Sequence, residues 1–150
     1  MAFANKNDVV AGRKPAPTPA DCDVTMPAFT QACVAADSAL NNVGAIGILP
    51  AGYLPKFAAV DSISGLGGTA AVSVGVLNAA GTDLSTDAAD GGAAWLTAQA
   101  VGTSAAGALT RSLAMAKVQR STKDRILAVK FTTAGSAAGD LTVNLAYSAN

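Results

Sequence analysis

The chain has 150 residues with ten basic side chains, ten acidic side chains and no histidine; only 13% of its residues are charged, and its mean hydropathy is +0.37. This length fits one domain with its own hydrophobic core. The zero net charge disfavours a protein that binds nucleic acid or an anionic membrane. The lack of histidine rules out a Ser-His-Asp triad and removes the commonest metal ligand.

Residues 1–20 carry three cations, Lys6, Arg13 and Lys14, and prolines at positions 15, 17 and 19. Proline lacks an N–H donor and favours an extended backbone, so this segment predicts an extended N-terminal arm before a domain of residues 21–150. No apolar pattern gives the arm a way to join the core. Two interpretations stay open: an unpacked tail, or an arm that lies on a neighbouring subunit.

Short stretches of alternating apolar residues follow the arm. A period of two is typical of a strand with one buried face. The pattern predicts strands over residues 21–30, 43–49, 57–63, 70–77, 125–132 and 140–147. It predicts that six side chains point inward together: Val72, Val74, Val129, Phe131, Val143 and Leu145.

Three other stretches are less regular. Residues 31–41 fit a turn of helix or a loop, and residues 93–101 fit a strand or two turns of helix around Trp95. Residues 109–118 alternate apolar and charged side chains, which predicts a partly wet edge strand. Strands at these spacings are typical of sandwiches. The sequence therefore predicts an all-β fold: an antiparallel β-sandwich, jelly-roll-like, with an extended N-terminal arm.

The two cysteines do not indicate a disulfide framework or a metal site. Cys22 and Cys33 are eleven residues apart, a spacing that matches neither a zinc site nor a redox motif, so we expect free thiols. The sequence shows no secretion signal and no apolar run of membrane-spanning length, so we expect a protein made and assembled in a cytoplasm.

Two loop motifs partly match known ligand-binding loops. GLGG, at residues 65–68, lacks the lysine and hydroxyl residue of a phosphate-binding loop and predicts a tight turn with positive φ. TDLSTDAADG carries Asp83, Asp87 and Asp90, but Ala88 and Ala94 stand where a calcium loop needs glycine and glutamate. We therefore expect a solvated loop whose aspartates cap turns, with no cofactor and no metal.

A basic cluster precedes the first of the two C-terminal strands. It contains Lys117, Arg120, Lys123 and Arg125. It fits a solvated hairpin tip or a contact with an acidic patch on a partner. The candidate partner-contact residues are Lys6, Arg13, Lys14, Lys117, Arg120 and Lys123. No GxSxG elbow is present and nothing selects a carboxylate pair, so we expect no enzyme and no catalytic residue.

Three segments carry a resemblance to a known family: ILPAGYLPKFAAVDS at 48–62, VSVGVLNAAGTDLSTDAADGGAAWL at 72–96 and DRILAVKFTTAGSAAGDLTVNLAYS at 124–148. A strand ending in a PAG turn, a strand running into LNAAGTDL and a terminal alternating hairpin resemble the capsid decoration, or cement, proteins of tailed bacteriophages. The resemblance covers about the last two-thirds of the chain. It is a pattern of strands and turns, and it leaves the N-terminal third unmatched.

The resemblance implies a virion protein on the exterior of an icosahedral capsid, assembled in the host cytoplasm. Its implied partners are the major capsid protein, whose neighbouring subunits it would staple together, and one or two further copies of itself. Nucleic acid and membrane are not among them. An alternative is a tail-fibre or carbohydrate-binding sandwich, although an aromatic content of 5% offers few rings for stacking on sugars.

Overall fold

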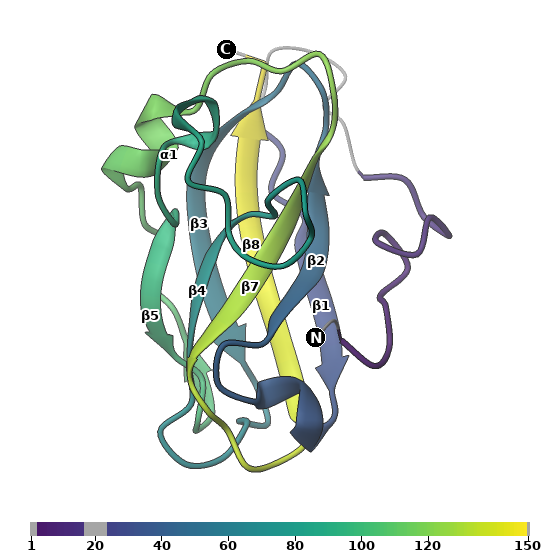
Figure 1. Cartoon of the computed structure of the whole chain (residues 1–150), viewed down its shortest axis with the longest axis vertical. Coiled ribbons are helices and arrows are strands. Elements are labelled where there is room, and N and C mark those ends of the chain that lie inside the picture. Colours follow the sequence, from purple (N-terminus) through teal and green to yellow (C-terminus); the bar gives the residue numbers. More distant parts are fainter. Residues whose placement is uncertain (1–2, 17–23, 150) are drawn as a thin grey trace.

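The computed structural model describes residues 3–16 and 24–149. Within these residues the chain forms eight strands, two 3₁₀ helices and one short α-helix (Figure 1). In chain order the elements are β1 Ala28–Cys33, η1 Ala35–Ser38, β2 Val43–Leu49, β3 Leu54–Ser62, β4 Ala71–Val76, η2 Ala88–Asp90, β5 Leu96–Ala100, β6 Ala105–Ala106, α1 Leu113–Lys117, β7 Arg125–Thr133 and β8 Gly139–Ser148. No helix among the described residues is long enough to cross a membrane.

The strands build two four-stranded antiparallel sheets that pack face to face. One sheet has the order β1-β8-β3-β6 and the other the order β2-β7-β4-β5. Most connections carry the chain from one sheet to the other, so neighbours in a sheet are rarely neighbours in sequence. The predicted antiparallel β-sandwich is confirmed.

The space between the sheets is filled by the side chains that alternate inward along each strand. The six side chains predicted to point inward together are all fully buried, which confirms the predicted faces. β8 lies between β1 and β3, with Val143 opposite Phe29 and Val60. β7 lies in the same way between β2 and β4. The last two strands of the sandwich, β7 and β8, therefore both lie inside their sheets, each paired on both sides.

The strand predicted over residues 109–118 is wrong. This stretch contains α1, which begins after Ser112, whose hydroxyl oxygen accepts the N–H of Met115 at 3.2 Å. Met115 and Val118 are buried three residues apart, whereas Leu113 is 70% exposed. Burial at helical spacing, with a serine cap in front, outweighed the alternation of charged and apolar residues.

Several other elements have boundaries that differ from the predicted ones. The first strand begins at Ala28 and extends to Cys33, later than predicted, and the stretch from 31 to 41 also holds η1. Between the two alternatives for residues 93–101, the strand is the observed one, as β5. The short strand β6 lies between β5 and α1, where the alternation of apolar residues predicts no strand. Residues 17–23, with Cys22, lie outside the described residues.

Residues 3–16 lie along the side of the sandwich where β1 and β2 form edges (Figure 1). Phe3 is 6% exposed and belongs to the core; its ring occupies the space in front of Gly44 on β2, where a Cβ would clash. The segment has no apolar pattern, as the sequence indicates, but the expectation that it therefore does not join the core is wrong. A single phenylalanine makes no periodic pattern, so its burial could not be predicted from the sequence.

Hydrogen bonds hold the same segment to both sheets. The backbone N–H of Ala4 donates to Asp37 at 2.8 Å, and that of Asn7 donates to the side-chain oxygen of Gln31 at 3.1 Å. Gln31 is only 2% exposed, and its amide nitrogen donates to the carbonyl oxygen of Asn5. Asn7 reaches the second sheet by donating to the carbonyl oxygen of Ile46. The segment thus satisfies polar groups that would otherwise be buried without partners.

Candidate partner-contact surfaces

Residues 7–14 form a compact turn, here called the N-terminal turn. The N–H of Ala11 donates to the carbonyl of Asn7 at 2.9 Å, and the N–H groups of Arg13 and Lys14 both donate to the carbonyl of Asp8, at 2.7 and 3.0 Å. These bonds bring two cationic side chains next to one carboxylate. The turn therefore presents Arg13 and Lys14 as a cluster instead of along an extended strand.

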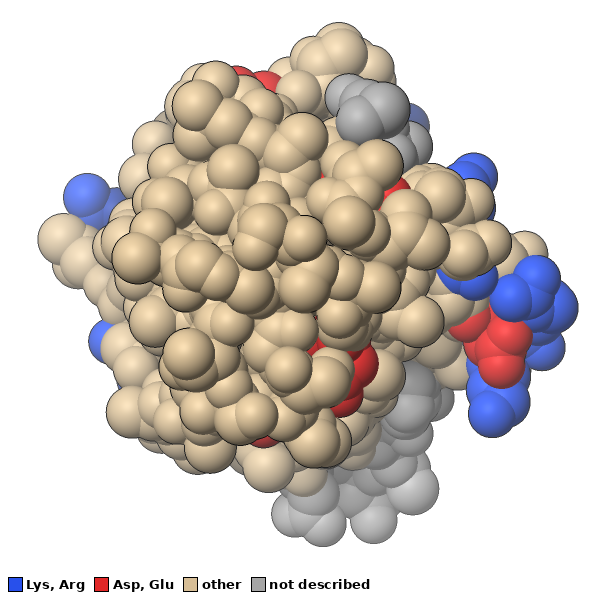
Figure 2. Space-filling model, turned by 90° about the horizontal axis from the view of Figure 1, so that it is seen from below, with Lys and Arg blue, Asp and Glu red and all other residues tan. Residues whose placement is uncertain are grey.

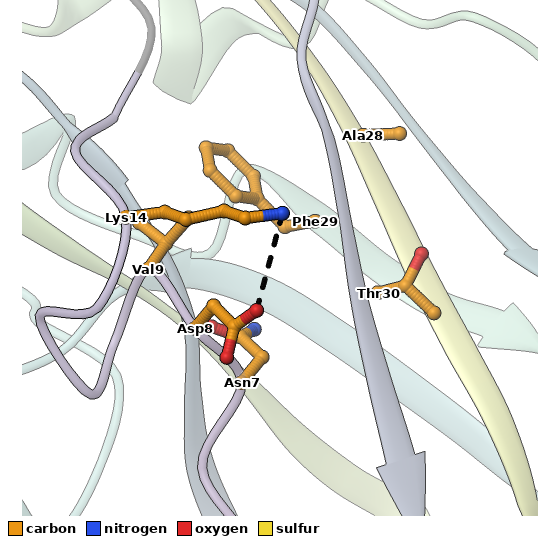
Figure 3. Close-up of a pocket in the computed structure, with 7 residues that line it drawn as sticks. All are labelled: Asn7, Asp8, Val9, Lys14, Ala28, Phe29 and Thr30. Atoms are coloured by element: carbon orange, nitrogen blue, oxygen red, sulfur yellow. Dashed lines mark ion pairs between the residues drawn. The ribbon is translucent and has the colours of Figure 1, made fainter.

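The charges of the N-terminal turn do not cancel. Arg13 Nε lies 2.7 Å from Asp8 Oδ1, and Lys14 Nζ lies 4.0 Å from Asp8 Oδ2 (Figure 3). The hydrogen bond and charge of Arg13 lower the pKa of the Asp8 carboxyl. Arg13 also donates to the backbone carbonyl of Lys6 at 3.2 Å. Two cations, Arg13 and Lys14, therefore share one carboxylate. Figure 2 shows cations gathered round a carboxylate at one margin of the molecule, the side on which Figure 1 places this segment.

A small cavity of about 200 Å³ separates the N-terminal turn from β1. Figure 3 shows Val9, Asp8 and Lys14 on one side of it and Phe29 and Thr30 of β1 on the other. Sites for small-molecule ligands usually measure about 300–1,000 Å³. We interpret this cavity as incomplete packing beneath the turn and not as a ligand site.

Arg120 and Lys123 line a larger open depression of about 700 Å³ at the end of the sandwich that carries α1. Arg120 donates to the carbonyl of Gly52 at 3.1 Å, and the neighbouring Asp124 accepts the N–H of Ala51 at 2.8 Å. These bonds fix the loop before β7 against the turn between β2 and β3. Lys117 is exposed in the last turn of α1 and does not line this depression.

The two groups of cations share one side of the molecule. A third depression, of about 470 Å³, is lined by Lys14 of the N-terminal turn and by Asp124, which also lines the larger depression. Folding thus places residues near position 14 beside residues near position 124. We call Lys6, Arg13, Lys14, Arg120 and Lys123 the basic surface. It contains five of the six candidate partner-contact residues, and Lys117 stands apart from it.

Arg125 does not belong to the exposed cluster in which the sequence placed it. It is 8% exposed, its Nε lies 2.7 Å from Asp90 Oδ1, and its Nη2 donates to the carbonyls of Ala89 and Gln119 at 3.0 and 2.7 Å. Its partner lies 35 positions away. No sequence spacing indicates this pair. Arg125 therefore joins loops together and is not available to a partner.

The three aspartates of TDLSTDAADG face three different groups. Asp83 binds Lys130 Nζ at 2.9 Å, which lowers the pKa of the Asp83 carboxyl. Asp87 accepts the N–H of Ala89 at 2.9 Å as the cap of η2, as the sequence predicted. Asp90 pairs with Arg125. The structure does not bring these carboxylates together.

The glycine loop at residues 65–68 is a tight turn, as predicted. Gly65, Gly67 and Gly68 have φ of 73°, 79° and 60°. The N–H groups of Leu66 and Gly67 donate to the carbonyls of Val101 and Gly102, both at 2.9 Å, so they are already bonded within the protein.

Cys33 is a free, buried cysteine, 4% exposed, in the face of β1 that packs on the core. Burial raises the pKa of its thiol to about 12. A thiol in this environment is not a nucleophile at neutral pH.

Two solved structures contain chains with the fold of this one. A chain in the capsid of Ralstonia phage GP4 superposes with a TM-score of 0.76 at 22% sequence identity, covering 99% of this chain and 97% of that one. A chain in the capsid asymmetric unit of cyanophage Pam1 gives a TM-score of 0.50 at 16% identity, covering 97% of both. At these identities the similarity shows a shared fold. No protein-family model and no curated protein matches the chain.

Proposed function

We propose that this chain is a structural protein of a bacteriophage virion that binds the outer surface of the capsid and stabilises contacts between major capsid protein subunits. The observation that carries the proposal is the end-to-end similarity to a chain of a phage capsid, which covers 99% of this chain and 97% of that one. The match extends over the whole molecule, so it relates two chains of nearly equal size. The decoration-protein resemblance of the sequence supports the same role.

The charge distribution supports attachment to a protein. The chain is neutral overall, yet the basic surface gathers cations from residues 6–14 and 120–123 on one side. A cationic side that adjoins open depressions suits an acidic patch on a partner protein, because charge complementarity guides docking. We propose the major capsid protein as this partner, with further copies of the chain as the other, rather than nucleic acid or a membrane.

The fold suits a purely structural role. Eight strands in two sheets, ordered β1-β8-β3-β6 and β2-β7-β4-β5, support assignment to the jelly-roll class, which builds many viral capsid domains. We assign residues 3–16 as a segment that packs on its own sandwich and contributes to the basic surface through the N-terminal turn. The proposed activity is mechanical and uses no cofactor.

Co-sedimentation with phage heads tests this proposal. Heads stripped of the protein are mixed with the wild-type chain and pelleted at low and at physiological salt. We expect the wild type to pellet with heads. The double variant Arg120→Glu/Lys123→Glu should pellet several-fold less, because it reverses the charge that faces the partner. The matched control is Lys117→Glu, which reverses one charge outside the basic surface and should pellet like wild type.

The outcomes separate the proposal from its alternative. Failure of the wild type to pellet with heads would overturn attachment to the capsid. Binding on a glycan array without binding to heads would instead favour a tail-fibre or carbohydrate-binding role. Equal pelleting of all variants would keep the capsid role and remove the basic surface from it.

A further inference from the structure

The outer face of the sheet β2-β7-β4-β5 is covered only in part. The loop of residues 77–95 packs over it at β4, where Leu84 Cδ1 lies 3.6 Å from the position that a Cβ on Gly75 would take. Figure 1 shows this loop crossing β7. Ile126 of β7 and its cross-strand partner Ile48 of β2 point to the same outer face. Ile126 is 42% exposed, so the loop leaves this part of the face open.

The two isoleucines form the floor of a trough. Ile126 lies in the depression of about 700 Å³, between the turn at residues 78–81 and the loop at residues 120–124. Ile48 lies in the depression of about 470 Å³, which the N-terminal segment borders on the other side. Because Ile48 pairs with Ile126 and Asp124 lines both depressions, the two are parts of one surface, here called the outer trough.

The outer trough carries an excess of positive charge. Its charged lining residues are Lys14, Arg120, Lys123, Arg125, Asp90 and Asp124. Arg125 and Asp90 neutralise each other as a nearly buried pair. Arg120 and Lys123 are exposed beside one carboxylate, Asp124, whose Oδ1 already accepts the N–H of Ala51. Lys14 shares the carboxylate of Asp8 with Arg13, so it adds to the excess.

The walls of the outer trough are fixed by hydrogen bonds within the protein. The N–H of Leu77 donates to the carbonyl of Ile126 at 2.8 Å, which ties the first wall to the floor. The N–H of Gln119 donates to the carbonyl of Ala89 at 2.9 Å, and Arg120 donates to the carbonyl of Gly52 at 3.1 Å. A surface that is ordered in advance loses little conformational entropy on binding.

We propose that the outer trough binds an extended segment of the partner protein in which acidic side chains flank an aliphatic one. The aliphatic side chain covers Ile126, and the carboxylates pair with Arg120 and Lys123. An apolar floor between cations selects this combination, because apolar burial and charge complementarity act on neighbouring groups. The inference rests on the proposed function, since it assigns the segment to the capsid, and it adds the chemistry by which the capsid is recognised.

A pair of opposite charges at one position tests the acidic character of the segment. Ala80 is exposed in the wall of the outer trough, so its substitution leaves the floor intact. In the co-sedimentation assay with stripped heads, Ala80→Glu should pellet several-fold less than wild type at low salt. Ala80→Lys should pellet at least as well as wild type. Both effects should weaken at higher salt, because salt screens exposed charges.

A second pair of variants tests the apolar floor. Ile126→Thr keeps a β-branched side chain on the strand but shortens its apolar part, and it should reduce pelleting several-fold. The matched control is Phe57→Thr on β3 of the other sheet, whose side chain is 41% exposed against 42% for Ile126. This control should pellet like wild type. Circular dichroism verifies that all variants are folded, and the Ala80 variants carry the test if Ile126→Thr is not.

The outcomes separate this inference from the proposed function. Wild-type protein that does not pellet with heads contradicts the proposed function. If wild type pellets, equal pelleting of Ala80→Glu and Ala80→Lys, or a greater loss for Ala80→Lys, overturns the inference alone. Carbodiimide coupling of bound protein should join the amine of Lys123 to a carboxylate of a capsid subunit. Coupling of Lys123 to a second copy of this chain instead would assign the outer trough to self-association and overturn the inference.

Discussion

The carboxylate of Asp140 organises the turn that follows β3. One of its oxygens accepts three donors, the N–H groups of Ile63 and Ser64 and the hydroxyl of Ser64, the last at 2.7 Å. The backbone N–H of Asp140 donates in return to the Ser64 hydroxyl at 3.1 Å. The Ser64 hydroxyl and these N–H donors lower the pKa of the Asp140 carboxyl. A single side chain at the start of β8 thus sets the position of Ile63 in the turn after β3.

This arrangement predicts a dependence of stability on pH. Because the pKa of Asp140 is lower in the folded chain than in the unfolded chain, the carboxylate stabilises the fold above the unfolded-state pKa, about 4. That contribution is lost as pH falls through the folded-state pKa. Urea unfolding from pH 7 to pH 2 should show falling stability below about pH 4. Asp140→Asn should show a weaker fall, and the same fall in both proteins would contradict this account.

At the scale of elements, the alternation of apolar residues was sufficient to predict the strands whose apolar positions face the core. The strand predicted at residues 43–49 has the bounds of β2, and the predicted inward faces of β4, β7 and β8 are correct. Alternation failed at residues 109–118, because Leu109 and Leu113 are exposed and burial follows the helical spacing of Met115 and Val118. A local sequence pattern does not show which apolar side chains pack against others in the folded chain.

The ion pairs made by the loops could not be predicted from the sequence, for a different reason. The pairs Arg125–Asp90 and Lys130–Asp83 join residues that are 35 and 47 positions apart. Both pairs fix the long loop after β4 to strand β7. Their formation depends on how the sandwich folds, so charge alone led the sequence analysis to place Arg125 on the surface.

Removal of one carboxylate from each pair should have unequal effects. The Arg125–Asp90 pair is nearly buried, with side chains 9% and 19% exposed, so Asp90→Asn leaves a buried cation without its counter-ion and should lower the free energy of unfolding by about 3 kcal/mol. The Lys130–Asp83 pair is 26% and 49% exposed, so Asp83→Asn should cost less than about 1 kcal/mol. Chemical denaturation of both variants measures which one loses more free energy of unfolding. Equal losses would contradict the prediction.

At the scale of the whole molecule, the sequence supplied the cations of the candidate site but not their arrangement. Lys6, Arg13 and Lys14 lie more than 100 positions before Arg120 and Lys123, and only the packing of residues 3–16 on the sandwich brings them to one side. The same packing depends on Phe3, a residue with no periodic neighbours. Sequence pattern therefore identified the candidate residues and excluded none of the alternatives for the N-terminal segment.

Deletion of residues 1–16 should destabilise the isolated protein. It removes Phe3 from the core and the hydrogen bonds that Ala4, Asn5 and Asn7 make with Asp37 and Gln31. Loss of a buried phenylalanine alone costs about 3–5 kcal/mol, so we expect a decrease of roughly 3 kcal/mol or more in the free energy of unfolding. The control Lys6→Ala/Arg13→Ala/Lys14→Ala keeps Phe3 and should unfold like wild type. A truncated protein of unchanged stability would mean that the packing of Phe3 contributes little.

The position of β7 and β8 at the centres of the two sheets has a consequence for biosynthesis. Strands β1 to β4 find their principal partners in residues 125–148, which the ribosome makes after them. Long-range pairing of this kind is slow, and it cannot begin before those residues are available. A chain interrupted by a nonsense mutation or by early release therefore has no partial sandwich to present. We therefore expect that only chains that include residues 125–148 acquire the folded surfaces proposed to contact a partner, so that topology alone would exclude shorter translation products from assembly.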